Sequence, residues 1–63
     1  MTKAQALADF KENILPGIKE TEAKGTGRVD GPMRSEAWND YTDMLCKNRQ
    51  ITPKQYRNWT NPF

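Results

Sequence analysis

The chain has no internal means of cross-linking itself, although its length would normally call for one. It contains 63 residues, among them a single cysteine, Cys46, and no histidine. One thiol cannot form an internal disulfide, and zinc sites need several cysteine or histidine ligands. A domain this short buries only about 60% of the surface that its unfolded chain exposes, so its core gives marginal stability. We therefore expect one domain without metal or cofactor, stabilised by helix packing, self-association or a partner.

Charges are unevenly distributed along the sequence, although the net charge is only +2. Residues 1–24 balance four lysines against four acids, whereas the last eighteen residues hold no acid and four cations, Lys47, Arg49, Lys54 and Arg57. Such a basic C-terminal segment suits phosphate or an acidic protein surface, but four charges are also common on an ordinary solvated face. No apolar run approaches the ~20 residues that span a bilayer. None is long enough for the apolar region of a signal peptide either. We expect a soluble, cytosolic chain that does not enter a membrane.

Residues 1–24 are predicted to form an amphipathic helix with a kink. Thr2 can cap its start, and apolar residues recur at steps of three and four, namely Ala4, Leu7, Phe10, Ile14 and Ile18. The opposite face is polar, with Gln5, Asp9, Glu12 and Asn13. Pro16 lacks an amide hydrogen and its ring clashes with the preceding turn, so the helix should kink or restart near Leu15. Residues 25–32 contain three glycines and a proline, which predicts a flexible loop.

Residues 33–63 are predicted to form a helical αα-hairpin. Its first helix should begin near Pro32, with Asp30 or Gly31 as the cap. The 3.6-residue period gives this helix an inner face of Ala37, Trp38, Tyr41, Met44 and Leu45. The outer face then holds Glu36, Asp40, Asp43 and Lys47.

The last helix has a clear start signal in the segment Thr52-Pro53-Lys54-Gln55, which has the pattern of a capping box. Ile51 and Tyr56 occupy the two positions of a hydrophobic staple, and Asn61 and Pro62 should end the helix. Its inward residues should be Tyr56 and Trp59. The fold class is therefore all-α, a small single domain over residues 1–63.

The residues that most catalytic sites require are absent or isolated. There is no histidine to act as a general base, and Cys46 has no histidine to activate it as a nucleophile. Glu36, Asp40 and Asp43 could pair as carboxylates, but their spacing is that of a solvated helical stripe. The glycines of residues 25–27 lack the strand and the Gly-Lys-Ser/Thr motif of a phosphate-binding loop. We expect that the protein is not an enzyme.

Two kinds of binding remain open. Six aromatic residues are many for so small a core, so one of Trp59 or Phe63 is expected to be exposed for a partner protein or a second copy. The candidate partner-binding residues are Glu36, Asp40, Asp43, Lys54, Arg57, Trp59 and Phe63. Alternatively, the hairpin has the outline of a helix-turn-helix. Its second helix would then enter a groove of DNA with four polar side chains, Lys54, Gln55, Arg57 and Asn58. The low net charge and the acidic stripe weigh against this alternative.

From about Arg34 onward the sequence resembles small, mostly uncharacterised helical proteins of tailed bacteriophages. The resemblance is carried by residues 36–47 (EAWNDYTDMLCK), 50–52 (QIT) and 55–62 (QYRNWTNP). It implies no catalytic residue, but it implies a setting, because phages use such short proteins to bind and redirect host enzymes or as small regulators. The leading hypothesis is a non-enzymatic phage accessory protein that acts in the host cytoplasm, where it binds and modulates a host protein, most simply by inhibition. A helix-turn-helix DNA-binding regulator and a structural homo-oligomer are the alternatives.

Overall fold

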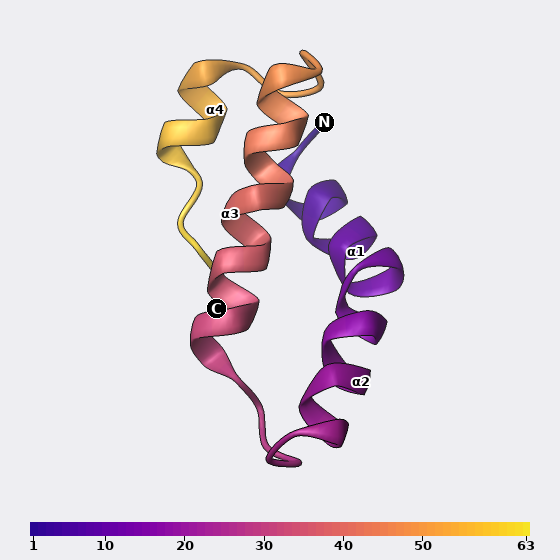
Figure 1. The fold of residues 1–63 in the computed structure, drawn as a ribbon. Coiled ribbons are helices and arrows are strands. Elements are labelled where there is room, and N and C mark those ends of the chain that lie inside the picture. Colours follow the sequence, from indigo (N-terminus) through magenta and orange to yellow (C-terminus); the bar gives the residue numbers. More distant parts are fainter.

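The computed structural model describes residues 1–63 and consists of four helices without any strand. They are α1 (Lys3–Asn13), α2 (Leu15–Lys24), α3 (Gly31–Lys47) and α4 (Pro53–Asn58). α1 and α2 follow one another along one side of α3, and α4 turns back along the other side (Figure 1). The molecule is elongated, with extents of 36 × 18 × 18 Å. The all-α class and the αα-hairpin of α3 and α4 are confirmed.

The N-terminal helix is broken at Ile14, as Pro16 predicts. Pro16 lies in the first turn of α2, where its missing amide hydrogen has no intrahelical acceptor. The buried residues are Ala6 and Phe10 in α1 and Leu15, Ile18 and Glu22 in α2. In an unbroken helix, which turns by about 100° per residue, these two groups would lie on different sides. The break turns α2 so that Leu15 and Ile18 join the same hydrophobic core as Ala6 and Phe10.

Two details of the predicted apolar face are wrong. Ala4 is exposed and Ala6 is fully buried. Two three-residue steps back from Phe10 lead to Ala4 and turn away from the inward side, whereas one four-residue step leads to Ala6 and stays close to it. Leu15 is buried more deeply than Ile14, since the break advances the inward position by one residue. Both errors concern the direction of a face rather than the existence of a helix.

α3 supplies the centre of the core. Trp38 is only 1% exposed, and its ring centroid lies 5.4 Å from that of Phe10 in an edge-on arrangement. Tyr41 and Leu45 complete the inner face, as predicted. Met44, which was also expected there, is 48% exposed because it lies about 100° around the helix from Leu45, on the flank that faces solvent.

α4 begins at the predicted capping box. The Gln55 amide donates to Thr52 Oγ1 at 3.1 Å, and the Thr52 amide donates to Gln55 Oε1 at 2.8 Å. The helix ends at Asn58, and Trp59 has an extended backbone that takes its side chain out of the helical pattern. Trp59 packs against the core as expected, but Tyr56 is 39% exposed, so its predicted inward position is wrong.

The C-terminal tail folds back onto the core. Asn61 Nδ2 donates to the Ser35 carbonyl at 3.1 Å and to Ser35 Oγ at 2.9 Å, which fastens the tail to α3. The Phe63 ring then lies 5.2 Å from that of Phe10 and 6.3 Å from that of Trp38, measured between centroids. The tail thereby covers a side of the core that α1 and α3 leave open.

Candidate functional site

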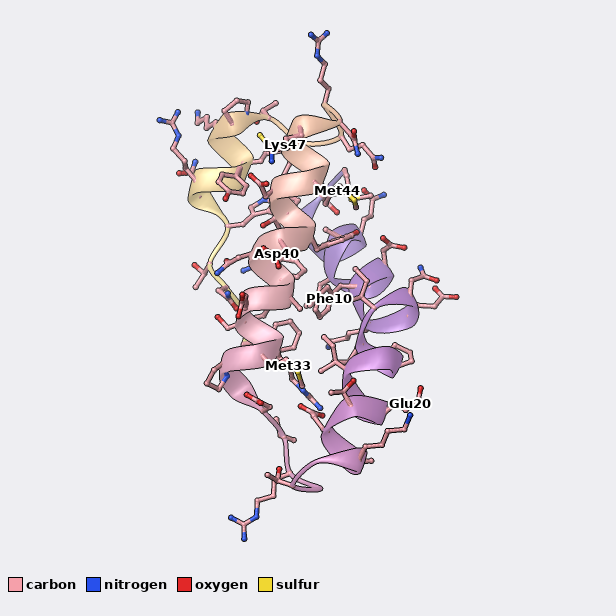
Figure 2. All side chains as sticks on the ribbon, in the orientation of Figure 1. Phe10, Glu20, Met33, Asp40, Met44 and Lys47 are labelled. Atoms are coloured by element: carbon pink, nitrogen blue, oxygen red, sulfur yellow. The ribbon has the colours of Figure 1, made fainter.

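The side of α3 that points away from the core forms a first candidate surface. Its residues recur at steps of three and four, opposite Trp38, and we call them the outer face of α3: Glu36, Asp40, Asp43, Met44 and Lys47. Figure 2 shows Asp40, Met44 and Lys47 following one another along this helix. Asp43 is half-buried and the other four residues are exposed. The structure therefore brings together the three acidic residues that were predicted to bind a partner.

The charges of this outer face are only partly neutralised. Lys47 Nζ lies 2.9 Å from Asp43 Oδ2, and the hydrogen bond that Lys47 donates to this carboxylate raises the pKa of Lys47 above its usual value. Glu36 and Asp40 have no ion-pair partner within the chain. The outer face therefore presents two free carboxylates beside one exposed thioether side chain.

A second candidate surface lies where the N-terminus meets the connection between α3 and α4 (Figure 1). The Met1 amino group donates to the Gln50 carbonyl at 3.3 Å, and Gln55 Nε2 donates to the Met1 carbonyl at 3.1 Å. These bonds join residues 1–8 to residues 44–63, two segments without an acidic side chain. Four cations of these segments form no ion pair, and we call them the basic end: Lys3, Arg49, Lys54 and Arg57.

The expectation that Trp59 or Phe63 stands free of the core is wrong. Both are half-buried and pack against the core, because the extended chain after Asn58 returns along α3. The core therefore has room for more aromatic side chains than the chain length suggests. The aromatic residue with the largest exposure is Tyr56.

The side chains proposed to read DNA bases are not equally available. Lys54, Arg57 and Asn58 are exposed on α4. Gln55 is half-buried, and both ends of its amide are engaged, with Thr52 and with Met1. The outward side of α4 therefore offers two cations and one free amide, without the glutamine.

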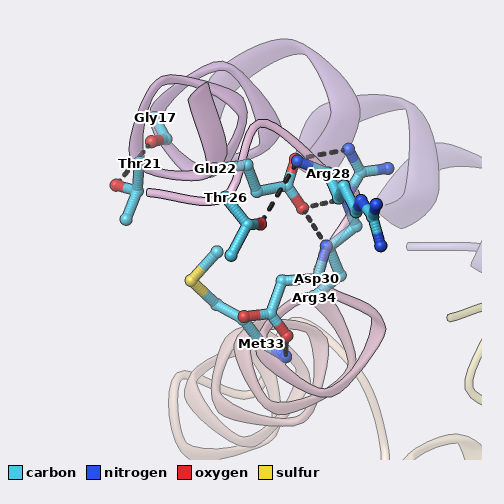
Figure 3. Close-up of polar contacts among 8 residues, drawn as sticks. All are labelled: Gly17, Thr21, Glu22, Thr26, Arg28, Asp30, Met33 and Arg34. Carbon is cyan, nitrogen blue, oxygen red and sulfur yellow. Dashed lines mark hydrogen bonds and ion pairs between the residues drawn. The ribbon is translucent and has the colours of Figure 1, made fainter. Parts of the chain in front are cut away.

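An ion pair between Glu22 and Arg34 closes the loop between α2 and α3 (Figure 3). The Glu22 carboxylate accepts hydrogen bonds from Arg34 Nε at 2.9 Å, from Arg34 Nη2 at 2.8 Å and from the Asp30 amide at 2.7 Å. The side chains of Glu22 and Arg34 are 6% and 15% exposed. The bonds from Arg34, and then the one from Asp30, hold the pKa of Glu22 below its usual value. This pair is not predictable from the sequence pattern, whose one local signal is that Glu22 follows Ile18 by four residues on the inward side.

Asp9 and Tyr41 form a second buried polar contact, between α1 and α3. The Tyr41 hydroxyl donates to the Asp9 carboxylate, so Asp9 does not lie wholly on the solvent side as predicted. Burial, and then this bond to a carboxylate, raise the pKa of Tyr41 well above its usual value. The N-terminal helix is thus fixed to the hairpin by a polar contact as well as by aromatic packing.

The structure contains no enclosed pocket and no group of three or more side chains placed to hold a metal ion. None of its four helices combines the length and the hydropathy that a membrane-spanning helix requires. The candidate sites are two surface patches, the outer face of α3 and the basic end. No protein-family model, curated protein or solved structure matches this chain.

Proposed function

We propose that this chain is a non-enzymatic accessory protein of a tailed bacteriophage, which binds a host protein in the host cytoplasm through the outer face of α3 and inhibits it. The observation that carries the proposal is the position of Met44, which is 48% exposed beside the free carboxylates of Glu36 and Asp40. Four of the five residues of this face of the longest helix are exposed. The phage setting rests on the resemblance of residues 34–63.

The charge of the outer face indicates the chemistry of the partner. Two unpaired carboxylates favour a basic patch, because complementary charges steer association and exclude wrong partners. Met44 adds a flexible apolar side chain, of the kind that adapts to irregular partner surfaces. The proposed partner is therefore a host protein with a basic surface that has an apolar depression at its centre.

The test compares the wild-type chain with the variant Glu36→Gln/Asp40→Asn, which removes both free charges while keeping side-chain size. A matched control is Glu12→Gln/Glu20→Gln, which removes as much charge from exposed positions of α1 and α2. A host protein captured from lysate should be inhibited by the wild type and by the control. We expect the Glu36/Asp40 variant to bind it at least about tenfold more weakly, the loss of roughly 1.4 kcal/mol.

Two results would contradict the proposal. One is a captured protein that binds the Glu36/Asp40 variant as well as the wild type. The other is a wild-type chain that retains no host protein at all. Sedimentation at micromolar concentration should show a monomer, and a dimer that dissociates in the Glu36/Asp40 variant would assign the outer face to a second copy instead.

A further inference from the structure

We infer that the basic end, formed by Lys3, Arg49, Lys54 and Arg57, binds the phosphate backbone of a nucleic-acid duplex without reading its sequence. This surface is separate from the outer face of α3, and the inference does not depend on the proposed host partner. Its basis is the arrangement of charges that the fold creates from the two ends of the chain.

The fold concentrates free cations at one end of the molecule. The bonds of Met1 with Gln50 and Gln55 bring the start of α1 against the connection between α3 and α4. No acidic side chain occurs in either of the joined segments, 1–8 and 44–63. Lys47, the remaining cationic side chain of these segments, is paired with Asp43 and therefore does not belong to the basic end. The four residues of the basic end have no such partner. Arg49, Lys54 and Arg57 are exposed and Lys3 is half-buried.

The geometry of these side chains suits extended phosphate contacts. Lys54 and Arg57 are three residues apart on α4, which places them as neighbours on one side of that helix. Arg49 has a left-handed backbone (φ 60°) at the corner where α3 ends, and it is exposed. The basic end thus extends over the corner and α4, across a molecule about 18 Å wide.

A uniformly anionic polymer fits this surface better than an acidic protein. Protein surfaces intersperse charges of both signs, whereas duplex DNA presents one negative charge per about 1.7 Å of its axis. The segments that carry these four cations contain no acidic side chain, and the neighbouring Asp43 is paired with Lys47, so repulsion from such a backbone is small. Gln55, one of the two α4 amides that could read an adenine, is held by Thr52 and Met1, which leaves only Asn58. Because α4 has only six residues and its other outward side chains are cations, we assign the contacts to phosphates, which carry no sequence information.

The experiment measures binding of the full chain to a fluorescent duplex DNA of about 20 base pairs by anisotropy, over a range of salt concentrations. Each phosphate contact contributes about 0.9 to the slope of log affinity against log salt, so three or four contacts give a slope of about −3 to −4. The variant Lys54→Gln/Arg57→Gln should bind at least about tenfold more weakly at low salt, with a slope smaller by about 2.

The matched control is Lys11→Gln/Arg28→Gln, which removes a lysine and an arginine from exposed positions outside the basic end. It should keep the wild-type slope and an affinity within about twofold. Circular dichroism verifies that both variants are folded. The Glu36→Gln/Asp40→Asn variant should bind the duplex at least as well as the wild type, which separates this inference from the proposed function.

Three results would overturn the inference. Equal loss of binding in the two basic variants would mean that only net charge matters. A slope that Lys54→Gln/Arg57→Gln leaves unchanged would place the contacts elsewhere. Displacement of the duplex by poly-glutamate at equal charge concentration would identify an acidic protein surface as the ligand.

Discussion

Glu22 occupies a position in α2 where the inward stripe would ordinarily carry an apolar residue, one turn after Ile18. A carboxylate withdrawn from water destabilises the fold unless it is paired and hydrogen-bonded. Glu22 accepts three hydrogen bonds, two from Arg34 and one from the Asp30 amide. The Asp30 side chain in turn caps α3, by accepting from the Met33 amide at 3.0 Å. One carboxylate therefore connects α2, the end of the loop and the first turn of α3.

Glu22 should make the stability of the protein depend on pH in the acid range. Its pKa is lower in the folded protein than the usual 4.5, so its stabilising contribution is fully present above about pH 4.5 and is lost as the pH falls through the folded-state value. Glu22→Gln should lower the melting temperature at neutral pH. It should also reduce the further decrease between about pH 5 and pH 3, measured by circular dichroism.

The exposed residue Glu12 provides the control for this measurement. Because Glu12 forms no ion pair, Glu12→Gln should lower the melting temperature at neutral pH much less than Glu22→Gln does. A Glu22→Gln variant with wild-type melting behaviour at neutral pH would show that the ion pair with Arg34 adds nothing to stability.

Residue-scale features were predictable where they depend on neighbours in the sequence. Thr52 and Gln55 are three residues apart, and Asp30 directly precedes the helix that it caps, so local geometry alone defines their roles. The pairing of Glu22 with Arg34 depends on how the intervening loop places α3. No local pattern contains that information.

Among the helices, α1 and α4 both begin with a capping box. Thr2 and Gln5 form a capping box as Thr52 and Gln55 do, with the Thr2 amide donating to Gln5 Oε1 at 2.8 Å. The two helices differ in what else holds them. α1 has 11 residues and buries Ala6 and Phe10, whereas α4 has 6 residues and buries none. α4 should therefore depend on its cap more than α1 does.

Thr52→Ala and Thr2→Ala should separate these two cases. Each substitution removes a cap and should lower stability by about 1 kcal/mol, measured by urea unfolding. In Thr52→Ala we also expect faster hydrogen exchange at the amides of Tyr56 and Trp59, which donate to Thr52 and Gln55 within α4. Thr2→Ala should leave these two amides unchanged. Equal exchange in both variants would mean that packing of the tail, and not the cap, maintains α4.

The break in the N-terminal helix was predictable, but its effect on the inward face was not. A proline disrupts the interior of any helix, so the sequence alone predicts a break before Pro16. Whether Ile14 or Leu15 then faces the core depends on the angle at which α2 meets α3. That angle is set by packing with Trp38 and its neighbours, which are far away in the sequence.

For the whole molecule, the aromatic cluster takes the place of the missing cross-link. Phe10 from α1 and Trp38 from α3 each contact the other and also contact Tyr41 of α3 and Phe63 of the tail, so three separate segments share one core. The helical class followed from periodicity. The return of the tail to the core could not be predicted, because the residues after Asn58 have no periodic pattern. Their position is fixed by contacts of Asn61 and Phe63 with residues that are distant in the sequence.

Trp38→Ala tests this account of the core. Removing a large buried aromatic side chain should lower stability by about 3–5 kcal/mol, close to the whole stability of a marginal domain. The variant should therefore lose most of its helical circular dichroism at 25 °C. Trp59→Ala, at a half-buried position, should remain folded. A Trp38→Ala variant that unfolds at the wild-type urea concentration would refute the central role of Trp38.

The bond between Gln55 and Met1 has a consequence for the order of folding. The contacts that close the chain span 12 residues from Glu22 to Arg34, 32 from Asp9 to Tyr41 and 54 from Met1 to Gln55. Because the entropy lost on closing a loop grows with its length, the turn between α2 and α3 should form first and the contact of Met1 last. Arg49, Lys54 and Arg57 lie close together in the sequence, whereas Lys3 reaches them only through the contact of Met1, so the basic end is complete only once folding is complete. The contribution of Lys3 to duplex affinity would then depend on the contact between Met1 and Gln55.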